Sequence, residues 1–244
     1  MIPQRVDGEA AYVLHARSYK ETSQIIEVFT HRYGRLGLLA RGSRRPKSAV
    51  RGLLNAFQPL RIGWAGRGEL PALQSAEFAG PAAVLSGERV LAGFYMNELL
   101  MKLLQRNDPH PELFLLYAQT MGSFSETAPL EPELRRFEIG LLRELGYGLN
   151  LLSDALTHEP LRDEAQYEYR VEVGAVLAQS AGSTRERRLF WGRELRAIAR
   201  QDFAAPQTLA AARRLLRLVL NHYLGERGLE TRRIAAAMRR QVPA

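Results

Sequence analysis

The sequence contains no cysteine and very little lysine. The absence of cysteine among the 244 residues excludes disulfide bonds, iron–sulfur clusters, thiolate zinc sites and a cysteine nucleophile. No apolar run approaches the roughly 18 residues of a membrane span, and the first residues lack the apolar core of a signal peptide. We therefore expect a soluble, cytoplasmic protein with no membrane partner.

The motifs of common active sites are missing as well. The sequence has no phosphate-binding loop, no dinucleotide-binding glycine motif, no serine-hydrolase elbow and no zinc-protease helix motif. The five histidines are scattered singly, and the acidic residues do not gather as a metal-dependent nuclease requires. We expect a binding protein rather than an enzyme, with no metal, no cofactor and no small-molecule substrate.

The charge that is present is basic and unevenly distributed. The chain carries 34 basic and 26 acidic residues, which gives a net charge of +8, and only Lys20, Lys47 and Lys102 are lysines. Residues 1–80 hold 12 basic and 6 acidic residues, residues 81–154 hold 6 and 10, and residues 155–244 hold 16 and 10. This pattern indicates a polyanionic partner. Arginine suits phosphate binding, although a GC-rich genome produces the same bias toward arginine.

The N-terminal third reads as a small β-barrel. Short apolar, β-prone runs separated by turns that contain glycine predict five strands, over residues 11–17, 24–30, 35–41, 57–64 and 70–78. Pro59 favours an edge or a late start for the fourth strand, because proline cannot donate a ladder hydrogen bond. Five strands that close on themselves predict an OB-type barrel, and an SH3-like barrel remains the alternative.

The connection between the third and fourth strands is the most informative segment. Residues 41–52 hold five positive charges and no acidic residue, while glycine, serine and proline keep the backbone irregular. This loop predicts a phosphate-binding surface, and the aromatic rings of Tyr33, Phe57 and Trp64 are candidates for stacking on bases. The alternative is that the loop is only solvated and the rings fill the barrel. The predicted nucleic-acid site comprises Arg35, Arg41, Arg44, Arg45, Lys47, Arg51 and Arg67.

Residues after Ser86 follow the helical period. We expect a helical domain over residues 81–149, a small β-containing insertion over 150–188, and C-terminal helices over 189–244 that pack with the helical domain. The fold class is therefore α+β, with an OB-fold domain over residues 1–80. Arginines on the C-terminal helices are either a solvated face or a second DNA surface, comprising Arg213, Arg214, Arg217, Arg232 and Arg233.

Several short strings, in order and at consistent spacing along nearly the whole chain, together resemble one family. They are Tyr12-Val13-Leu14-His15, Glu21-Thr22-Ser23, Phe29-Thr30 with Gly34-Arg35 and Ala40-Arg41-Gly42-Ser43-Arg44, Tyr95-Met96-Asn97-Glu98-Leu99-Leu100, Leu134-Arg135-Arg136-Phe137-Glu138, Leu145-Gly146-Tyr147-Gly148 and Tyr223-Leu224-Gly225. The sequence is similar to the bacterial RecO recombination mediators.

The resemblance implies both an activity and partners. It implies a protein that binds single- and double-stranded DNA, anneals complementary strands and works with RecR to load RecA onto DNA coated with single-strand-binding protein, without hydrolysing nucleotides. It places the protein in the RecF pathway of DNA repair, near the nucleoid. Many members of this family carry a four-cysteine zinc site after the Leu-Gly-Tyr string, and this chain has no cysteine there.

The resemblance also implies a site for the acidic C-terminal tail of single-strand-binding protein. Such a tail needs an apolar pocket with cations at its rim. We expect this pocket in the helical domain, although a plain apolar core beside solvated arginines explains the same residues. The candidate residues are Leu99, Leu103, Leu113, Arg135, Arg136, Phe137 and Leu141.

Two other functions remain open at the level of the sequence. An OB-fold protein that binds structured RNA without catalytic activity fits the same basic barrel, and a contact to the 2′-hydroxyl group would distinguish it. A metal nuclease fits less well, because the basic N-terminal domain offers only six dispersed acidic residues.

Overall fold

The computed structural model of the chain describes residues 4–81, 85–125, 128–178, 188–225 and 228–241. The chain forms two compact units, Met1–Ala128 with Leu229–Ala244, and Pro129–Gly228. The expected helical domain over residues 81–149 is therefore divided between the two units. This division arises because the first two helices cluster with the barrel, whereas the third packs against a later helix of the second unit.

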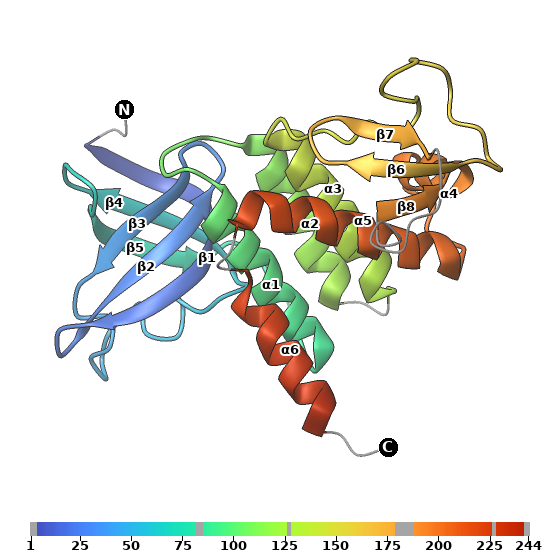
Figure 1. The fold of residues 1–244 in the computed structure, drawn as a ribbon. Coiled ribbons are helices and arrows are strands. Elements are labelled where there is room, and N and C mark those ends of the chain that lie inside the picture. Colours follow the sequence, from blue (N-terminus) through green and yellow to red (C-terminus); the bar gives the residue numbers. More distant parts are fainter. Residues whose placement is uncertain (1–3, 82–84, 126–127, 179–187, 226–227, 242–244) are drawn as a thin grey trace. The chain divides into compact units, whose positions relative to one another are not determined.

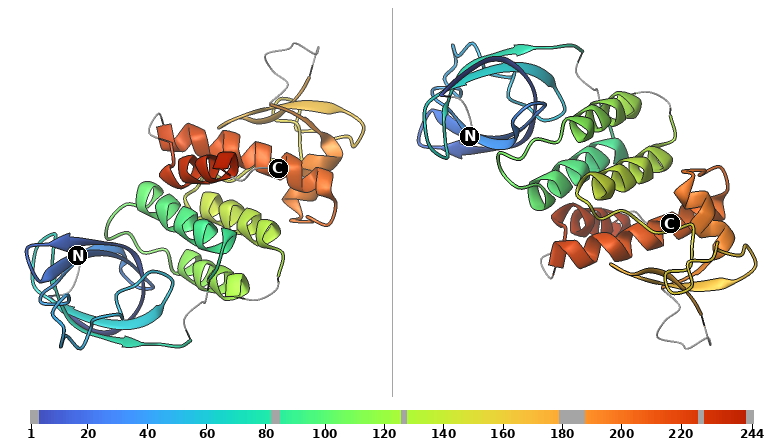
Figure 2. Two further views of the ribbon diagram at one scale, coloured as in Figure 1. Left: turned by 90° about the horizontal axis from the view of Figure 1, so that it is seen from below. Right: turned by 90° about the horizontal axis from the view of Figure 1, so that it is seen from above.

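The first unit begins with a closed five-stranded barrel. Its strands are β1 (Arg5–Tyr19), β2 (Ser23–Thr30), β3 (Gly34–Ala40), β4 (Pro59–Ala65) and β5 (Ala72–Phe78), arranged in the order β1-β2-β3-β5-β4. Views from below and above show the strands as a ring (Figure 2). The predicted OB-type barrel is confirmed, and Pro59 occupies the first position of β4, where a missing N–H group is tolerated.

Alternating side chains of these strands fill the barrel. Trp64, Ile26, Leu38 and Ile62 are fully buried, and they belong to one continuous apolar cluster. The register of β1 against β2 shifts between Val13 and His15, which is a β-bulge at Leu14. Because an extra residue cannot pair within the ladder, the carbonyl oxygen of Leu14 is available to a partner outside the sheet.

Helix α1 (Glu88–Leu103) supplies that partner. The side-chain amide of Asn97 donates a hydrogen bond to the Leu14 oxygen (3.0 Å), and the hydroxyl of Tyr117 on helix α2 (Pro111–Ser125) donates to Asn97 Oδ1 (2.6 Å). Asn97 is 2% exposed, so both hydrogen bonds are shielded from water. Close approach of α1 also requires Gly93, where a Cβ atom would lie 2.8 Å from the ring of Phe57.

The last helix of the chain returns to the first unit. Helix α6 (Glu230–Gln241) lies alongside α1 (Figure 1), and the carboxylate of Glu98 accepts hydrogen bonds from the backbone N–H groups of Glu230 and Thr231. Burial opposes ionisation of Glu98, but these hydrogen bonds and Lys102 lower the pKa of its carboxyl group below the ordinary value. Glu98 therefore caps the N-terminus of α6 from a different helix.

The second unit combines helices with a three-stranded sheet. Its elements are α3 (Leu130–Glu144), β6 (Gln166–Arg170), β7 (Gly174–Leu177), β8 (Leu189–Trp191), α4 (Gly192–Ala199) and α5 (Pro206–Leu224), with the sheet order β7-β6-β8. The helix that we expected from Leu189 begins only at Gly192. Residues 189–191 pair with β6 instead, because pairing of the short sheet overrides local helical periodicity.

A buried carboxylate organises the segment before this sheet. Asp154 is 5% exposed, and its two oxygens accept hydrogen bonds from the N–H groups of Leu156 (2.8 Å), Thr157 (3.1 Å) and Leu177 (2.7 Å). No group of histidine and acidic side chains within the described ranges is arranged to hold a metal ion. The residues present do not fit a thiolate zinc site, and Asp154 ties this loop to β7 by hydrogen bonds.

None of the helices within the described ranges combines the length and the apolar character that a membrane crossing requires.

Candidate nucleic-acid interface

The basic loop after β3 is a chain of tight turns that is anchored at both ends. Three successive backbone hydrogen bonds each run from an N–H group to the carbonyl oxygen three residues earlier. They are Arg45 to Gly42, Ser48 to Arg45 and Arg51 to Ser48. At the start of the loop the buried hydroxyl of Ser43 bonds Gln24 and the Ala40 carbonyl oxygen. At its end Leu54 belongs to the apolar cluster of the barrel, and Phe57 is buried against Phe94 of α1. Local turns and anchored ends hold the charged residues of this loop in one region.

The five cations of this loop are all exposed. Arg44 donates to the carbonyl oxygen of Glu21 at 3.4 Å. The other four cations are Arg41, Arg45, Lys47 and Arg51. Their side chains have no hydrogen bond or ion pair with any residue that the structure describes. Uncompensated guanidinium and ammonium groups on an ordered loop are available to phosphate oxygens.

The strand register brings three loops to one end of the barrel. Gln24 at the start of β2 pairs with Ala40 at the end of β3, Leu39 of β3 pairs with Ala72 at the start of β5, and Ala72 pairs with Ala65 at the end of β4. Because neighbouring strands lie about 5 Å apart, the β1–β2 turn, the basic loop and the β4–β5 turn emerge within about 15 Å of one another. OB-folds bind oligonucleotides with the β1–β2 and β4–β5 loops.

The β1–β2 turn adds two residues that the sequence did not reveal as candidates. Tyr19 is 36% exposed, and the ammonium group of Lys20 lies 5.5 Å from the centre of its ring. The N–H group of Arg44 donates to the carbonyl oxygen of Thr22, so the start of the basic loop contacts this turn. In the sequence, the only indication of this site was an aromatic residue next to a lysine in a turn. The register of the barrel strands is needed to show that this turn lies beside the basic loop.

The remaining members of the predicted DNA site have different surroundings. Arg67 is exposed in the β4–β5 turn and donates to the side chain of Gln4 at 3.1 Å. The guanidinium group of Arg35 is paired with Glu27 at 3.0 Å and donates to the Leu104 carbonyl oxygen, and its side chain is 13% exposed. Arg106 also pairs with Glu27. Arg35 thus joins β3 to the end of α1, whereas Arg67 remains accessible.

Of the three aromatic side chains that we considered for base stacking, Trp64 and Phe57 are buried and Tyr33 is partly buried against the barrel core. Trp64 is fully buried, and Tyr33 lies edge-on against it at 5.3 Å. Phe57 is 8% exposed and contacts Phe94 of α1 at 4.9 Å. The positions of Trp64 and Tyr33 agree with the alternative interpretation that these rings fill the barrel, whereas Phe57 packs against α1. Tyr19 is the exposed ring beside the loop.

The candidate second DNA surface is divided between the two units. On α5, Arg213 pairs with Glu131, and Arg214 lies over the ring of Phe190 and donates to the Leu189 carbonyl oxygen, whereas Arg217 is exposed. On α6, Arg232 contacts Tyr95 and Arg233 pairs with Glu230. Among the described residues Arg217 is the member of this set without a partner, and DNA contact by the set stays a prediction.

The residues proposed for the acidic-tail pocket also belong to both units. Leu99 and Leu113 are fully buried in the first unit, and Phe137 and Leu141 are fully buried in the second. Arg135 is 7% exposed and pairs with Glu138, whereas Arg136 is more exposed, pairs with Glu133 and lies 5.7 Å from the ring centre of Phe203. Leu103 is partly exposed. Of this set, Leu103 and Arg136 are the residues most open to a ligand.

Comparison with known proteins agrees with the architecture. The family described as "Recombination protein O N terminal" matches residues 8–82, and "Recombination protein O C terminal" matches residues 85–233. The chain is 44% identical over 234 residues to "DNA repair protein RecO" of Azoarcus sp. (strain BH72), a match that covers 96% of each chain. The protein of the same name from Dechloromonas aromatica is 46% identical over 236 residues, covering 94% of this chain and 95% of the relative.

A third relative extends this agreement to a slightly longer protein. "DNA repair protein RecO" of Ralstonia nicotianae is 40% identical over 230 residues, covering 94% of this chain and 84% of the relative. The two family regions together span most of the chain, from the first barrel strand to the last helix. The resemblance found in the sequence is confirmed, and the chain belongs to the RecO family of DNA repair proteins.

Proposed function

We propose that this chain is a non-enzymatic mediator of homologous recombination. In this proposal it binds single- and double-stranded DNA, anneals complementary strands and, with RecR, helps to load RecA onto DNA coated with single-strand-binding protein. The observation that carries the DNA-binding part is the convergence of exposed cations from three loops at one end of the barrel. Those loops contribute Lys20, Arg67 and the five basic residues between Arg41 and Arg51.

Charge neutralisation explains how such a surface anneals DNA. Two phosphate backbones repel each other, and cations that replace condensed counterions allow the strands to approach and pair. No phosphate-binding loop for ATP is present in the sequence. Annealing is therefore expected to proceed without ATP or a divalent metal ion and to weaken steeply as salt is raised.

Fluorescence-monitored annealing of complementary oligonucleotides by the purified protein tests this mechanism. We expect annealing in buffer that contains a chelator and no nucleotide, and we expect it to be suppressed by raised salt. A requirement for ATP would contradict the proposal. Competition between single-stranded DNA and RNA of one sequence is the second arm, because selective binding of RNA would favour an RNA-binding function that uses the 2′-hydroxyl group.

Recognition of single-strand-binding protein is a separate part of the proposal. Within the second unit, the partly exposed Arg136 offers a cation for the acidic residues of such a tail. Annealing of strands coated with intact single-strand-binding protein should be faster than annealing of strands coated with a tail-deleted form. Equal rates would remove tail recognition from the proposal without affecting DNA binding.

A further inference from the structure

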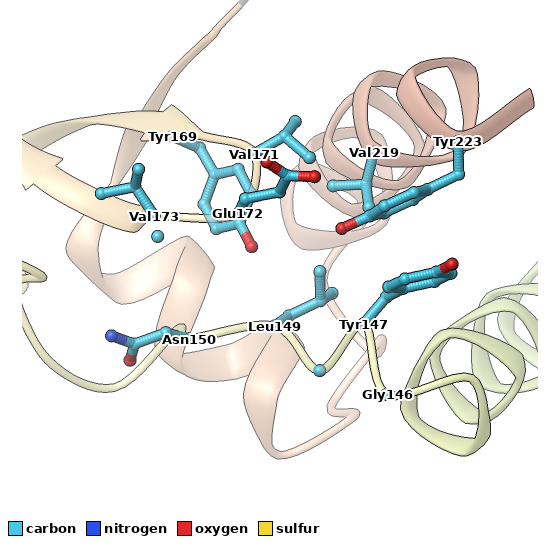
Figure 3. A pocket seen from close by; sticks show the side chains of 12 residues that line it. Gly146, Tyr147, Leu149, Asn150, Tyr169, Val171, Glu172, Val173, Val219 and Tyr223 are labelled. Carbon is cyan, nitrogen blue, oxygen red and sulfur yellow. The ribbon is translucent and has the colours of Figure 1, made fainter. Parts of the chain in front are cut away.

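A pocket of about 380 Å³ lies within the second compact unit. Its walls come from the extended segment after α3, the turn between β6 and β7, and one face of α5 (Figure 3). The family strings Leu145-Gly146-Tyr147-Gly148 and Tyr223-Leu224-Gly225 border it. This volume is near the lower end of the range of roughly 300–1,000 Å³ that is typical of ligand pockets, which suits one large side chain.

Tyrosines dominate the chemistry of this pocket. The rings of Tyr147 and Tyr223 are stacked, with centres 3.8 Å apart and planes within 12° of each other. Tyr169 is only 3% exposed, yet its hydroxyl group points into the pocket (Figure 3) and makes no hydrogen bond to any residue in the described part of the chain. Burial raises the pKa of Tyr169 to about 12, so this phenol is neutral at pH 7.

One carboxylate stands at the edge of the pocket. Glu172 occupies the turn between β6 and β7 with φ 68°, a left-handed conformation that is unfavourable for a residue other than glycine. Its side chain is 65% exposed and lies 3.2 Å from the exposed His222 of α5. The surrounding segment is also acidic, because residues 146–178 hold six acidic and two basic residues in a chain whose net charge is +8.

We propose that this pocket binds the guanidinium group of an arginine side chain that a protein partner presents. Glu172 pairs with a guanidinium group, an exposed ring face of the tyrosine pair stacks on its plane, and the Tyr169 hydroxyl accepts a hydrogen bond from one of its N–H groups. The acidic surroundings disfavour phosphate, so this site is distinct in ligand class from the basic barrel end. Val173 and Tyr147, which are 50% and 38% exposed, contact apolar residues beside the arginine.

Solution NMR of the full chain, without DNA, tests this assignment independently of the proposed function. The probe is the peptide acetyl-Leu-Arg-Leu-amide, and its matched control replaces arginine with citrulline, which has the same shape without the charge. We expect the arginine peptide to shift the backbone amide signals of Gly146, Gly148 and Gly174, which line the pocket. We expect the citrulline peptide to bind at least tenfold more weakly. Equal binding of the two peptides would overturn the proposal.

Two variants locate the effect in the pocket. Glu172→Gln removes the charge with little change of shape, and Tyr169→Phe removes the hydroxyl group, so each should weaken the arginine peptide at least fivefold. Glu164→Gln, which neutralises an exposed carboxylate in the same segment but outside the pocket, should leave its affinity unchanged. If Glu164→Gln weakened binding as much as Glu172→Gln, general charge rather than the pocket would hold the peptide.

A third probe separates a protein partner from a free cation. Spermidine carries several positive charges but no planar guanidinium group and no apolar residues. We expect it to bind more weakly than the arginine peptide at the same concentration. Spermidine binding as tight as that of the peptide, with the same three glycine signals shifted, would show a general cation site and overturn the assignment to a partner's arginine.

Discussion

Removal of three cations from the basic loop gives the sharpest test of the DNA interface. In the variant Arg44→Ala/Arg45→Ala/Lys47→Ala the loop keeps its turns, because Ser43 and the buried residues at its end still anchor it. Each cation that contacts a phosphate contributes about 0.7 to the slope of log affinity against log salt for a single strand. Three contacts therefore lower the magnitude of this slope by about 2.

The same relation gives the loss of affinity. If the electrostatic contribution vanishes near 1 M salt, three contacts account for about two orders of magnitude in affinity at 0.1 M salt. That loss corresponds to about 3 kcal/mol of binding free energy. The assay is fluorescence anisotropy of a labelled oligonucleotide at five or more salt concentrations, with circular dichroism to show that the variant is folded.

A matched variant separates local contact from net charge. Arg143→Ala/Arg162→Ala/Arg200→Ala also removes three exposed arginines, all from the second unit, and lowers the net charge by the same amount. We expect its salt slope to stay close to that of the parent protein. Equal slopes for the two variants would refute the reasoning, because affinity would then depend on total charge rather than on the loop.

Three further predictions test the exposed aromatic residue, the junction of barrel and helix, and the buried carboxylate. If the ring of Tyr19 stacks on a base, Tyr19→Ala should weaken single-stranded DNA binding by about 1–3 kcal/mol. The controls Tyr19→Phe, which keeps the ring, and Phe78→Ala, which removes another exposed ring, should leave the affinity unchanged. Fluorescence anisotropy measures the affinity of each variant, and an unchanged affinity of Tyr19→Ala would remove the ring from the site. Asn97→Ala leaves the Leu14 carbonyl oxygen and the Tyr117 hydroxyl group without this partner, so it should lower the free energy of unfolding by about 3 kcal/mol. Denaturant unfolding measures this loss, and the control Asn55→Ala, at an exposed asparagine, should cause little change. Burial opposes ionisation of Asp154, but the N–H groups of Leu156, Leu177 and Thr157 lower the pKa of its carboxyl group below the ordinary 3.8. The contribution of the Asp154 carboxylate to the stability of the protein is therefore present above about pH 4 and is lost as the pH falls through the lowered folded-state pKa. In thermal unfolding from pH 7 to 2, the parent protein should lose this contribution to its melting temperature at acid pH, and Asp154→Ala should not.

Local patterns were sufficient for most of the secondary structure. Apolar runs between glycine-containing turns predicted all five barrel strands, and the helical period after Ser86 predicted the helices of the middle and C-terminal segments. The prediction was wrong at residues 189–191, where three residues join a sheet whose other strands lie more than ten residues earlier. Pairing at that distance depends on tertiary contacts, which periodicity does not contain.

The candidate site shows the same limit. Arg35 and Arg44 look alike in the sequence, but the first is held by Glu27 and the Leu104 carbonyl oxygen and the second is exposed. Tyr19 and Trp64 are both aromatic residues at strand ends, yet Trp64 fills the barrel and Tyr19 lies open beside the basic loop. Which of two chemically similar residues reaches a ligand depends on the strand register and on the partners that burial imposes.

The sequence by itself determined the barrel, the helical segments, the absence of a thiolate metal site and the family, because these depend on composition, periodicity and local strings. Only the tertiary structure showed which contacts the residues of these short sequence strings make. In Tyr95-Met96-Asn97-Glu98, Asn97 satisfies the carbonyl of a barrel bulge and Glu98 caps a helix more than 130 residues later in the chain. Likewise, only folding brings the two tyrosine-containing strings to one pocket, because hydrogen bonds and stacking act through space between residues that are distant in the chain.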